Sequence, residues 1–145
     1  MQRKGYRLFV VSNQSGIARG YFTLDQVMTL NEQMRDWFQD RGISFEDMVI
    51  CPHHPEGQIK TYTRECACRK PRPGMLFQIA RHYEIDLSRS FMVGDRMIDA
   101  EAGMAAGAKG ILIHKKDSAN SIDMQPDFRE FESLLEFART LEPAA

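Results

Sequence analysis

The stretch SFMVGDRMIDAEAGMAAGAKGILI, residues 90–113, decides the fold. Residues 90–93 have the pattern of a short buried strand that ends in a glycine–aspartate turn, and residues 110–113 have the pattern of another. Between them, residues 95–107 are rich in alanine and glycine, which predicts a helix that can lie close to a sheet. A strand, a helix and a strand in this order predict two parallel strands joined by a crossover helix.

The same alternation extends to both sides of this stretch. A buried strand is predicted at residues 6–12 (YRLFVVS) and another short strand at 48–50, and residues 126–128 suggest a short fifth strand. Helices are predicted after Pro73, with apolar residues on one face as far as Tyr83, and over residues 131–141. The chain is therefore expected to form an α/β fold with a parallel sheet that helices cover on both faces.

A long helix is predicted between the first two strands. Thr23 followed by Gln26 matches a capping box, and Gly42 suits the position after the end of the helix. Its methionine-rich apolar face is expected to fill the core. The apolar residues at helical spacing are Leu24, Val27, Met28, Leu30, Met34, Trp37 and Phe38.

Bulk composition fits one globular domain over residues 1–145. The chain is 43% hydrophobic and 27% charged, which is ordinary for a soluble protein. A net charge of −1 indicates no general attraction to nucleic acid or acidic membranes. No stretch approaches 18 apolar residues, so neither a membrane partner nor a nucleic-acid partner is expected. Three clustered cysteines favour a reducing compartment over disulfides, and the cytoplasm is the expected location.

A metal site is predicted in the loop of residues 51–68. Two short motifs, Cys-Pro-His and Cys-Ala-Cys, supply two soft donors each: Cys51, His53, Cys66 and Cys68. Thiolates suit zinc, copper(I) or iron–sulfur clusters, and three sulfurs with one nitrogen favour a closed, structural zinc site. The alternative is three reduced thiols in a loop, since the usual C-x₂-C spacing is absent. The neighbouring His54 is expected to be an ordinary loop histidine.

Polar groups of complementary kinds are expected at three loops of the predicted sheet. A hydroxyl with nearby backbone N–H groups can cradle a phosphate, a lysine and an arginine can bind an anion, and two carboxylates can bind magnesium. Together they predict a site for magnesium-assisted phosphoryl transfer. Taken singly, each is also explained by a turn, a solvated lysine, or a helix N-cap with an exposed aspartate after it. The groups are Ser12 and Asn13, Arg69 and Lys70, and Asp95 and Asp99.

Four motifs in this order resemble the zinc-loop subgroup of the haloacid-dehalogenase-like (HAD) phosphatases: VVSNQSGIARG (residues 10–20), CPHHPEG, CACRKPRPGM and VGDRMIDAEAG (residues 93–103). The resemblance implies a three-layer, Rossmann-like fold, and the chain is expected to be a monomer. It also implies Mg²⁺-dependent hydrolysis of a phosphorylated sugar through an aspartyl-phosphate. The CPHHP spelling favours D-glycero-D-manno-heptose 1,7-bisphosphate, a lipopolysaccharide precursor, as the substrate, with histidinol phosphate as the alternative.

The resemblance also implies a role for each site residue. Ser12 would bind the phosphate, Lys70 would neutralise the phosphoryl group, and Asp95 would ligate Mg²⁺. Arg69 would recognise the second phosphate of the sugar, and Asp99 would lie near the magnesium. The substrate would also be lined by Asn13, Gln14 and Ser15, and the zinc would be held by Cys51, His53, Cys66 and Cys68.

The chain departs from the family pattern at its start. The family's nucleophile lies in an Asp-x-Asp-Gly turn after the first, central strand. That strand is expected to be missing from residues 1–145, and no aspartate precedes Asp25. Without that carboxylate the aspartyl-phosphate cannot form, so residues 1–145 alone are expected to be inactive. An internal start, a fragment or a degraded gene would each explain this. A non-catalytic phosphate-binding remnant and a zinc-stapled interaction module are the alternative functions.

Overall fold

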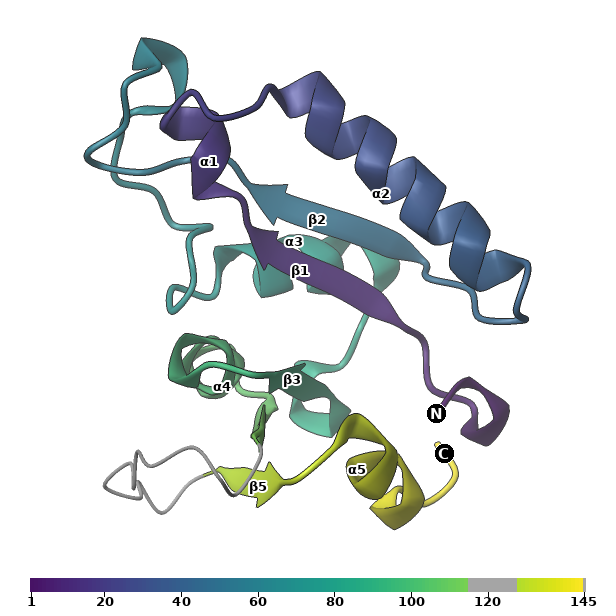
Figure 1. Cartoon of the computed structure of the whole chain (residues 1–145). Coiled ribbons are helices and arrows are strands. Elements are labelled where there is room, and N and C mark those ends of the chain that lie inside the picture. The colour runs from purple at the N-terminus through teal and green to yellow at the C-terminus, as the bar shows by residue number, and fades with distance from the viewer. Residues whose placement is uncertain (115–127, 145) are drawn as a thin grey trace. The chain divides into compact units, whose positions relative to one another are not determined.

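The computed structural model describes residues 1–114 and 128–144, which form the strands and helices drawn in Figure 1. Contacts group the chain into two compact units. Unit 1 comprises Met1–Arg69 with Pro143–Ala145, and unit 2 comprises Lys70–Glu142. A single domain over residues 1–145 remains a prediction.

Unit 1 is built on two parallel strands. Strand β1 (Phe9–Asn13) pairs with β2 (Asp47–Cys51), so that Val11 lies opposite Val49. Both predicted strands are confirmed. Each residue of β1 is only half-buried, whereas the sequence predicted a buried strand. The reason is that a sheet of two strands has no interior strand. The other elements of unit 1 are α1 (Ser15–Ala18), α2 (Leu24–Gln39) and the 3-10 turns η1 (Gln2–Lys4) and η2 (Lys60–Tyr62).

The capping box of α2 is confirmed, but the prediction that its apolar face fills the core is wrong. The Thr23 hydroxyl accepts from the Gln26 N–H at 3.2 Å, and the Gln26 amide oxygen accepts from the Thr23 N–H at 2.8 Å. Val27 is the one buried residue of the helix, while Met28 is 44% exposed. A helix over a two-stranded sheet has little surface to cover, so much of its apolar face remains in solvent.

Unit 2 contains the predicted strand–helix–strand arrangement. Its three strands are parallel in the order β3-β4-β5, with α4 between β3 and β4 along the chain. The predicted α/β class with parallel strands is confirmed. Its elements are α3 (Gly74–Tyr83), η3 (Leu87–Arg89), β3 (Phe91–Gly94), α4 (Met97–Ala105), β4 (Lys109–Ile113), β5 (Arg129–Phe131) and α5 (Leu134–Thr140).

Small residues bring α4 close to its sheet, as the sequence predicted. A Cβ atom at Gly103 would lie 2.5 Å from the Met92 Cβ, and one at Gly110 would lie 2.8 Å from the Ala100 carbonyl oxygen. Both distances are too short for a real side chain, so only glycine fits at these two positions. Ala100 and Ala102 of the helix are fully buried in this contact.

The C-terminal elements lie a few residues away from their predicted positions. The fifth strand covers Arg129–Phe131, while Pro126 and Asp127, predicted to be part of it, lie outside the described residues. The last helix begins at Leu134 and not at Phe131. The reason is that Phe131 belongs to the sheet, where its ring packs 5.3 Å from that of Phe137.

Among the helices of residues 1–114 and 128–144, none combines the length and the apolar character needed to cross a bilayer.

Candidate phosphate and metal site

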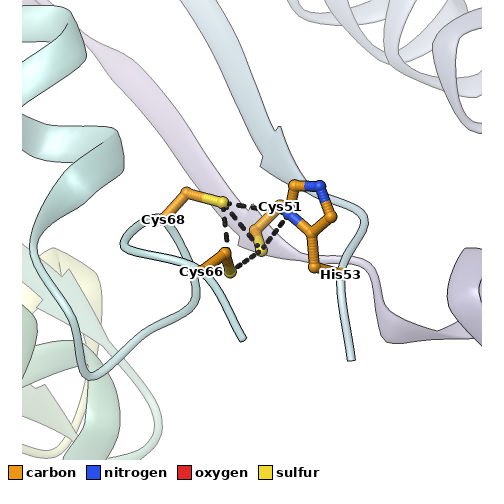
Figure 2. A group of neighbouring side chains, drawn as sticks. All are labelled: Cys51, His53, Cys66 and Cys68. Carbon is orange, nitrogen blue, oxygen red and sulfur yellow. Dashed lines mark hydrogen bonds between the residues drawn. The ribbon is translucent and has the colours of Figure 1, made fainter. Parts of the chain in front are cut away.

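The four predicted metal donors meet at the end of β2 in unit 1. Cys51 is the last residue of β2, His53 follows two residues later, and the loop returns with Cys66 and Cys68 (Figure 2). Their potential ligand atoms all lie within 4.8 Å of one another. The sequence spacing therefore placed all four donors in one cluster correctly.

The dimensions of the cluster fit a tetrahedral zinc site. The Cys68 Sγ atom lies 3.1 Å from that of Cys51 and 3.4 Å from that of Cys66. Zn–S bonds of about 2.3 Å in a tetrahedron separate the sulfurs by about 3.8 Å. The sulfurs would therefore move apart by about 0.4 to 0.7 Å around a zinc ion. Four protein donors leave no position for a substrate, as in structural zinc sites.

Burial of the three thiols opposes their ionisation unless a cation binds to them. Burial raises the pKa of Cys51, and the hydrogen bond with Cys68 raises it further. Burial also raises the pKa of Cys68. Burial opposes ionisation of Cys66 too, but hydrogen bonds from Cys68 and from backbone N–H groups outweigh it and lower its pKa. A divalent cation would favour the thiolate form of all three.

His53 presents its Nδ1 atom to the sulfurs. Nδ1 lies 3.3 Å from the Cys68 Sγ, and the burial of the ring, followed by the charge of Arg64, lowers the pKa of His53. The neutral imidazole is the form that binds metals. On the other side of the ring, Arg64 lies 2.7 Å from Nε2. A metal on Nδ1 places the ring proton on Nε2, facing the arginine donor, so metal binding requires Arg64 to move away.

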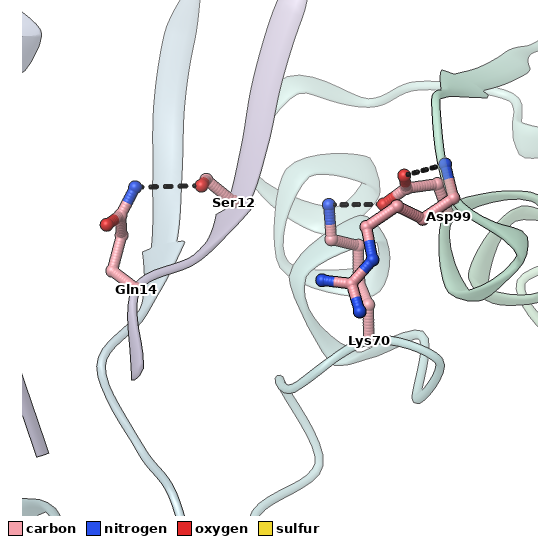
Figure 3. A network of polar contacts seen from close by, with 5 residues as sticks. Ser12, Gln14, Lys70 and Asp99 are labelled. Atoms are coloured by element: carbon pink, nitrogen blue, oxygen red, sulfur yellow. Dashed lines mark hydrogen bonds and ion pairs between the residues drawn. The ribbon is translucent and has the colours of Figure 1, made fainter. Parts of the chain in front are cut away.

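Ser12 lies near the carboxyl end of β1 with its hydroxyl already in a hydrogen bond. The Gln14 amide donates to the Ser12 Oγ atom at 2.9 Å (Figure 3). This bond occupies an acceptor position of the hydroxyl and leaves its own hydrogen to be donated elsewhere. Ser12 is therefore prepared to donate to an anion.

In unit 2, Lys70 forms a buried ion pair with Asp99. The Lys70 Nζ atom lies 2.6 Å from the Asp99 Oδ1 atom, and the two side chains are 11% and 7% exposed (Figure 3). The other carboxylate oxygen, Oδ2, accepts from the Arg96 backbone N–H at 3.1 Å. A Cβ atom at Gly94 would lie 2.2 Å from the Asp99 side chain, so the glycine of the Gly-Asp motif makes room for this carboxylate.

The sequence also allows Asp95 as a helix N-cap followed by an exposed Asp99, and the structure shows that this alternative is wrong. Arg96 is the N-cap of α4, and Asp99 is buried. Asp95 is exposed and directly follows the last residue of β3. An exposed carboxylate at the carboxyl end of a parallel strand is well placed to bind a cation.

The site residues are divided between the two units. Ser12 lies in unit 1 with the metal cluster, whereas Lys70 and Asp95 lie in unit 2. Their convergence on one anion therefore remains a prediction. Arg69, in unit 1, places its Nη1 atom 3.4 Å from the His53 carbonyl oxygen.

Two contacts of the site were not foreseen from the sequence. The Lys70–Asp99 pair joins residues from two motifs, and only the glycine at position 94 hints at the space that Asp99 needs. His54, expected to be an ordinary loop histidine, lies 3.1 Å from the Arg19 guanidinium. No periodicity or spacing in the sequence connects residues 19 and 54.

The chain is similar to known proteins in sequence and in structure. Residues 67–136 match the family model described as HAD-hydrolase-like. The chain is 46% identical over 107 residues to D-glycero-β-D-manno-heptose-1,7-bisphosphate 7-phosphatase of Yersinia pestis. This match covers 73% of the chain and 56% of that protein. The chain is also 47% identical over 116 residues to the protein of the same name from Pasteurella multocida. That match covers 79% of the chain and 62% of that protein.

A solved structure is similar over nearly the whole chain. It is D,D-heptose 1,7-bisphosphate phosphatase from B. bronchiseptica, complexed with magnesium and phosphate, with a TM-score of 0.81 at 29% identity. The likeness covers 95% of this chain and 75% of that one. The chain spans less than two thirds of the length of the curated relatives above.

Proposed function

We propose that the HAD-like hydrolase domain of this chain serves a Mg²⁺-dependent phosphatase acting on a sugar bisphosphate, with heptose 1,7-bisphosphate as the first candidate. Relatives of that name at 46% and 47% identity support the substrate. The single observation that best supports phosphoryl transfer is the buried Lys70–Asp99 pair. Lys70 directly follows Arg69, and Asp99 follows Asp95 by four residues.

In this proposal Lys70 stabilises the phosphoryl group during transfer. An ammonium group with little access to water interacts strongly with a nearby anion. Asp99 holds that ammonium in place and is itself fixed by the Arg96 N–H at 3.1 Å. Asp99 is therefore a positioning residue for Lys70.

Asp95 is the proposed magnesium ligand. Magnesium prefers one or two carboxylates together with phosphate and water oxygens. The oxygens of Asp99 are engaged by Lys70 and Arg96, whereas Asp95 is exposed next to the end of β3. When bound there, magnesium would screen the charge of the phosphoryl group. Ser12 would donate its hydroxyl hydrogen to a phosphate oxygen.

The Cys₃His cluster is the proposed zinc site, with a structural function. Its donors fix both ends of the loop between residues 51 and 68, which carries only one 3-10 turn of regular structure in the described residues. Arg69 follows directly after the last donor, so the metal would also position the proposed second-phosphate ligand.

The proposed reaction needs a carboxylate nucleophile, and the sequence predicts none within residues 1–145. The test therefore compares this chain with a version extended upstream in its reading frame. An extended chain that carries an Asp-x-Asp turn is expected to release phosphate from heptose 1,7-bisphosphate with Mg²⁺. In that chain Lys70→Met should lower kcat by a hundredfold or more. An extended chain with this turn that hydrolyses neither heptose bisphosphate nor histidinol phosphate overturns the assignment.

A non-catalytic phosphate-binding remnant is the second candidate, because no nucleophile is assigned in the chain. It would gain thermal stability from the bisphosphate without turning it over, with and without the upstream extension. Turnover by the extended chain excludes it.

A further inference from the structure

Two nitrogen donors of unit 1 face each other beside the metal loop. Arg19 directly follows α1, and His54 directly follows the predicted zinc ligand His53. The Arg19 Nη2 atom lies 3.1 Å from the His54 Nε2 atom. Both side chains are half-buried, and neither has a role in the function proposed above.

The other ring nitrogen of His54 is already used as an acceptor. The Glu56 backbone N–H donates to Nδ1 at 3.1 Å. A neutral imidazole has one donor and one acceptor nitrogen, so with Nδ1 accepting from Glu56 the proton lies on Nε2. A protonated ring carries a hydrogen on Nε2 as well. In either form, an N–H of the ring faces an N–H of the guanidinium, and no acceptor lies between them.

Arg19 has a second donor without an acceptor. Its Nε atom is buried and has no hydrogen-bond partner among the described residues. Buried N–H groups in proteins almost always have a partner. Three donors at one place therefore indicate that an acceptor oxygen belongs between Arg19 and His54.

The backbone around these donors is tightly packed. The Ala18 carbonyl oxygen accepts from the Gln58 and Ile59 N–H groups at 2.7 and 2.9 Å. A Cβ atom at Gly57 would lie 2.8 Å from the same oxygen, so the loop touches the end of α1. These contacts hold the end of α1 against the loop that carries His54. The Arg19 guanidinium and the His54 Nε2 atom are therefore kept opposite each other.

We propose that Arg19 and His54 form an oxyanion subsite, in which an oxygen of a phosphate group accepts hydrogen bonds from the Arg19 guanidinium and from His54 Nε2. Arg69 reaches the same segment, with its Nη1 atom 3.4 Å from the His53 carbonyl oxygen. Two arginines from different parts of unit 1 thus approach residues 53–54. The occupant is the phosphate of the sugar bisphosphate that is not transferred, and this identification rests on the proposed function.

The ring proton of His54 provides the first test. Two-bond ¹H–¹⁵N correlation spectra of the full chain at a constant pH of about 8, where an ordinary histidine is neutral, report which nitrogen carries it. We expect the proton on Nε2 and a shift of this signal that saturates with inorganic phosphate. A proton on Nδ1, or a signal that inorganic phosphate leaves unchanged, overturns the proposal.

The second test uses binding affinities measured by calorimetry. Fructose 1,6-bisphosphate and fructose 6-phosphate serve as probes with two phosphates and one. Arg19→Met should weaken the bisphosphate about tenfold or more, since hydrogen bonds to charged groups contribute strongly, and should change the monophosphate less than twofold. An equal loss for both probes, or no loss, contradicts the subsite. Lys60→Met removes an exposed positive charge from the same loop and should leave both affinities unchanged.

A third variant separates binding from folding. In His54→Gln the amide oxygen can accept from Arg19, so the donors no longer need an anion. This variant should melt at or above the temperature of the parent chain and still lose the preference for the bisphosphate. A preserved preference counts against the subsite even if Arg19→Met fails to fold. Absence of turnover in the extended chain refutes the phosphatase and leaves the ring signal as an independent measure of the anion site.

Discussion

At the scale of single residues, the Lys70–Asp99 pair is the interaction whose loss should be most costly. Its atoms are 2.6 Å apart and both side chains are nearly buried. Removing one partner leaves the other charge uncompensated, so Asp99→Ala should lower the free energy of unfolding by about 3–5 kcal/mol. Urea denaturation measures this, with the exposed Asp36→Ala as the control. A loss below about 1 kcal/mol would show that water reaches Lys70 freely.

The contribution of Asp86 to the free energy of unfolding should depend on pH. The Ser88 hydroxyl and N–H donate to its carboxylate at 2.6 and 2.9 Å and lower its pKa below the usual 3.8. Because the folded pKa is the lower one, the stabilisation is present above the unfolded value and disappears as the pH falls through the folded value. Asp86→Asn should therefore be less stable than the parent near neutral pH. The difference in unfolding free energy should shrink below about pH 4, and a constant difference would contradict this.

The site residues show what could be predicted from sequence at this scale. Cys51, His53, Cys66 and Cys68 were identified because two short motifs bring paired donors together along the chain. The contacts of Asp99 with Lys70 and of His54 with Arg19 were not predicted. They join residues far apart in sequence, and their geometry depends on space left by Gly94 and Gly57.

At the scale of elements, the start of α2 depends on its capping box. Thr23→Ala removes the acceptor for the Gln26 N–H and should lower the free energy of unfolding by about 1 kcal/mol. Thr29→Ala, an exposed position inside the same helix, is the matched control and should be neutral or slightly stabilising. Equal effects of the two substitutions would assign no particular role to the cap.

Local sequence patterns predicted helices and strands well where the same residues also make the stabilising contacts. The capping box, the small residues of α4 and the β-branched strands act through neighbours in sequence or directly across a sheet. Burial was harder to predict. The apolar face of α2 is ideal by periodicity, yet Met28 and Trp37 are 44% and 52% exposed, because burial depends on how many strands lie beneath the helix. Phe131 likewise belongs to β5 and not to the last helix.

At the scale of the whole molecule, the metal cluster lies entirely in unit 1, so metal loss should affect the two units differently. Removal of zinc with a chelator, or Cys66→Ser, should increase hydrogen exchange of the amides in residues 51–68. Structural zinc stabilises folding directly, so the metal-loaded form should hold one zinc per chain and melt at a higher temperature. The amides of α4 and β4 in unit 2 should keep their protection. Equal loss of protection in both units would show that they unfold together.

The metal donors Cys51 and His53 precede a segment that ends at Cys66 and Cys68. Within this segment, Lys60 and Arg64 are both exposed. These are cleavage positions for trypsin, which needs several residues of extended, mobile chain to act. With the ends of the segment tied to one ion, the protease should cut slowly; once the ion is withdrawn, the same bonds should be cut within minutes. The rate at which the chain is split in this segment would then report, on an ordinary gel, how much of a purified sample carries its metal.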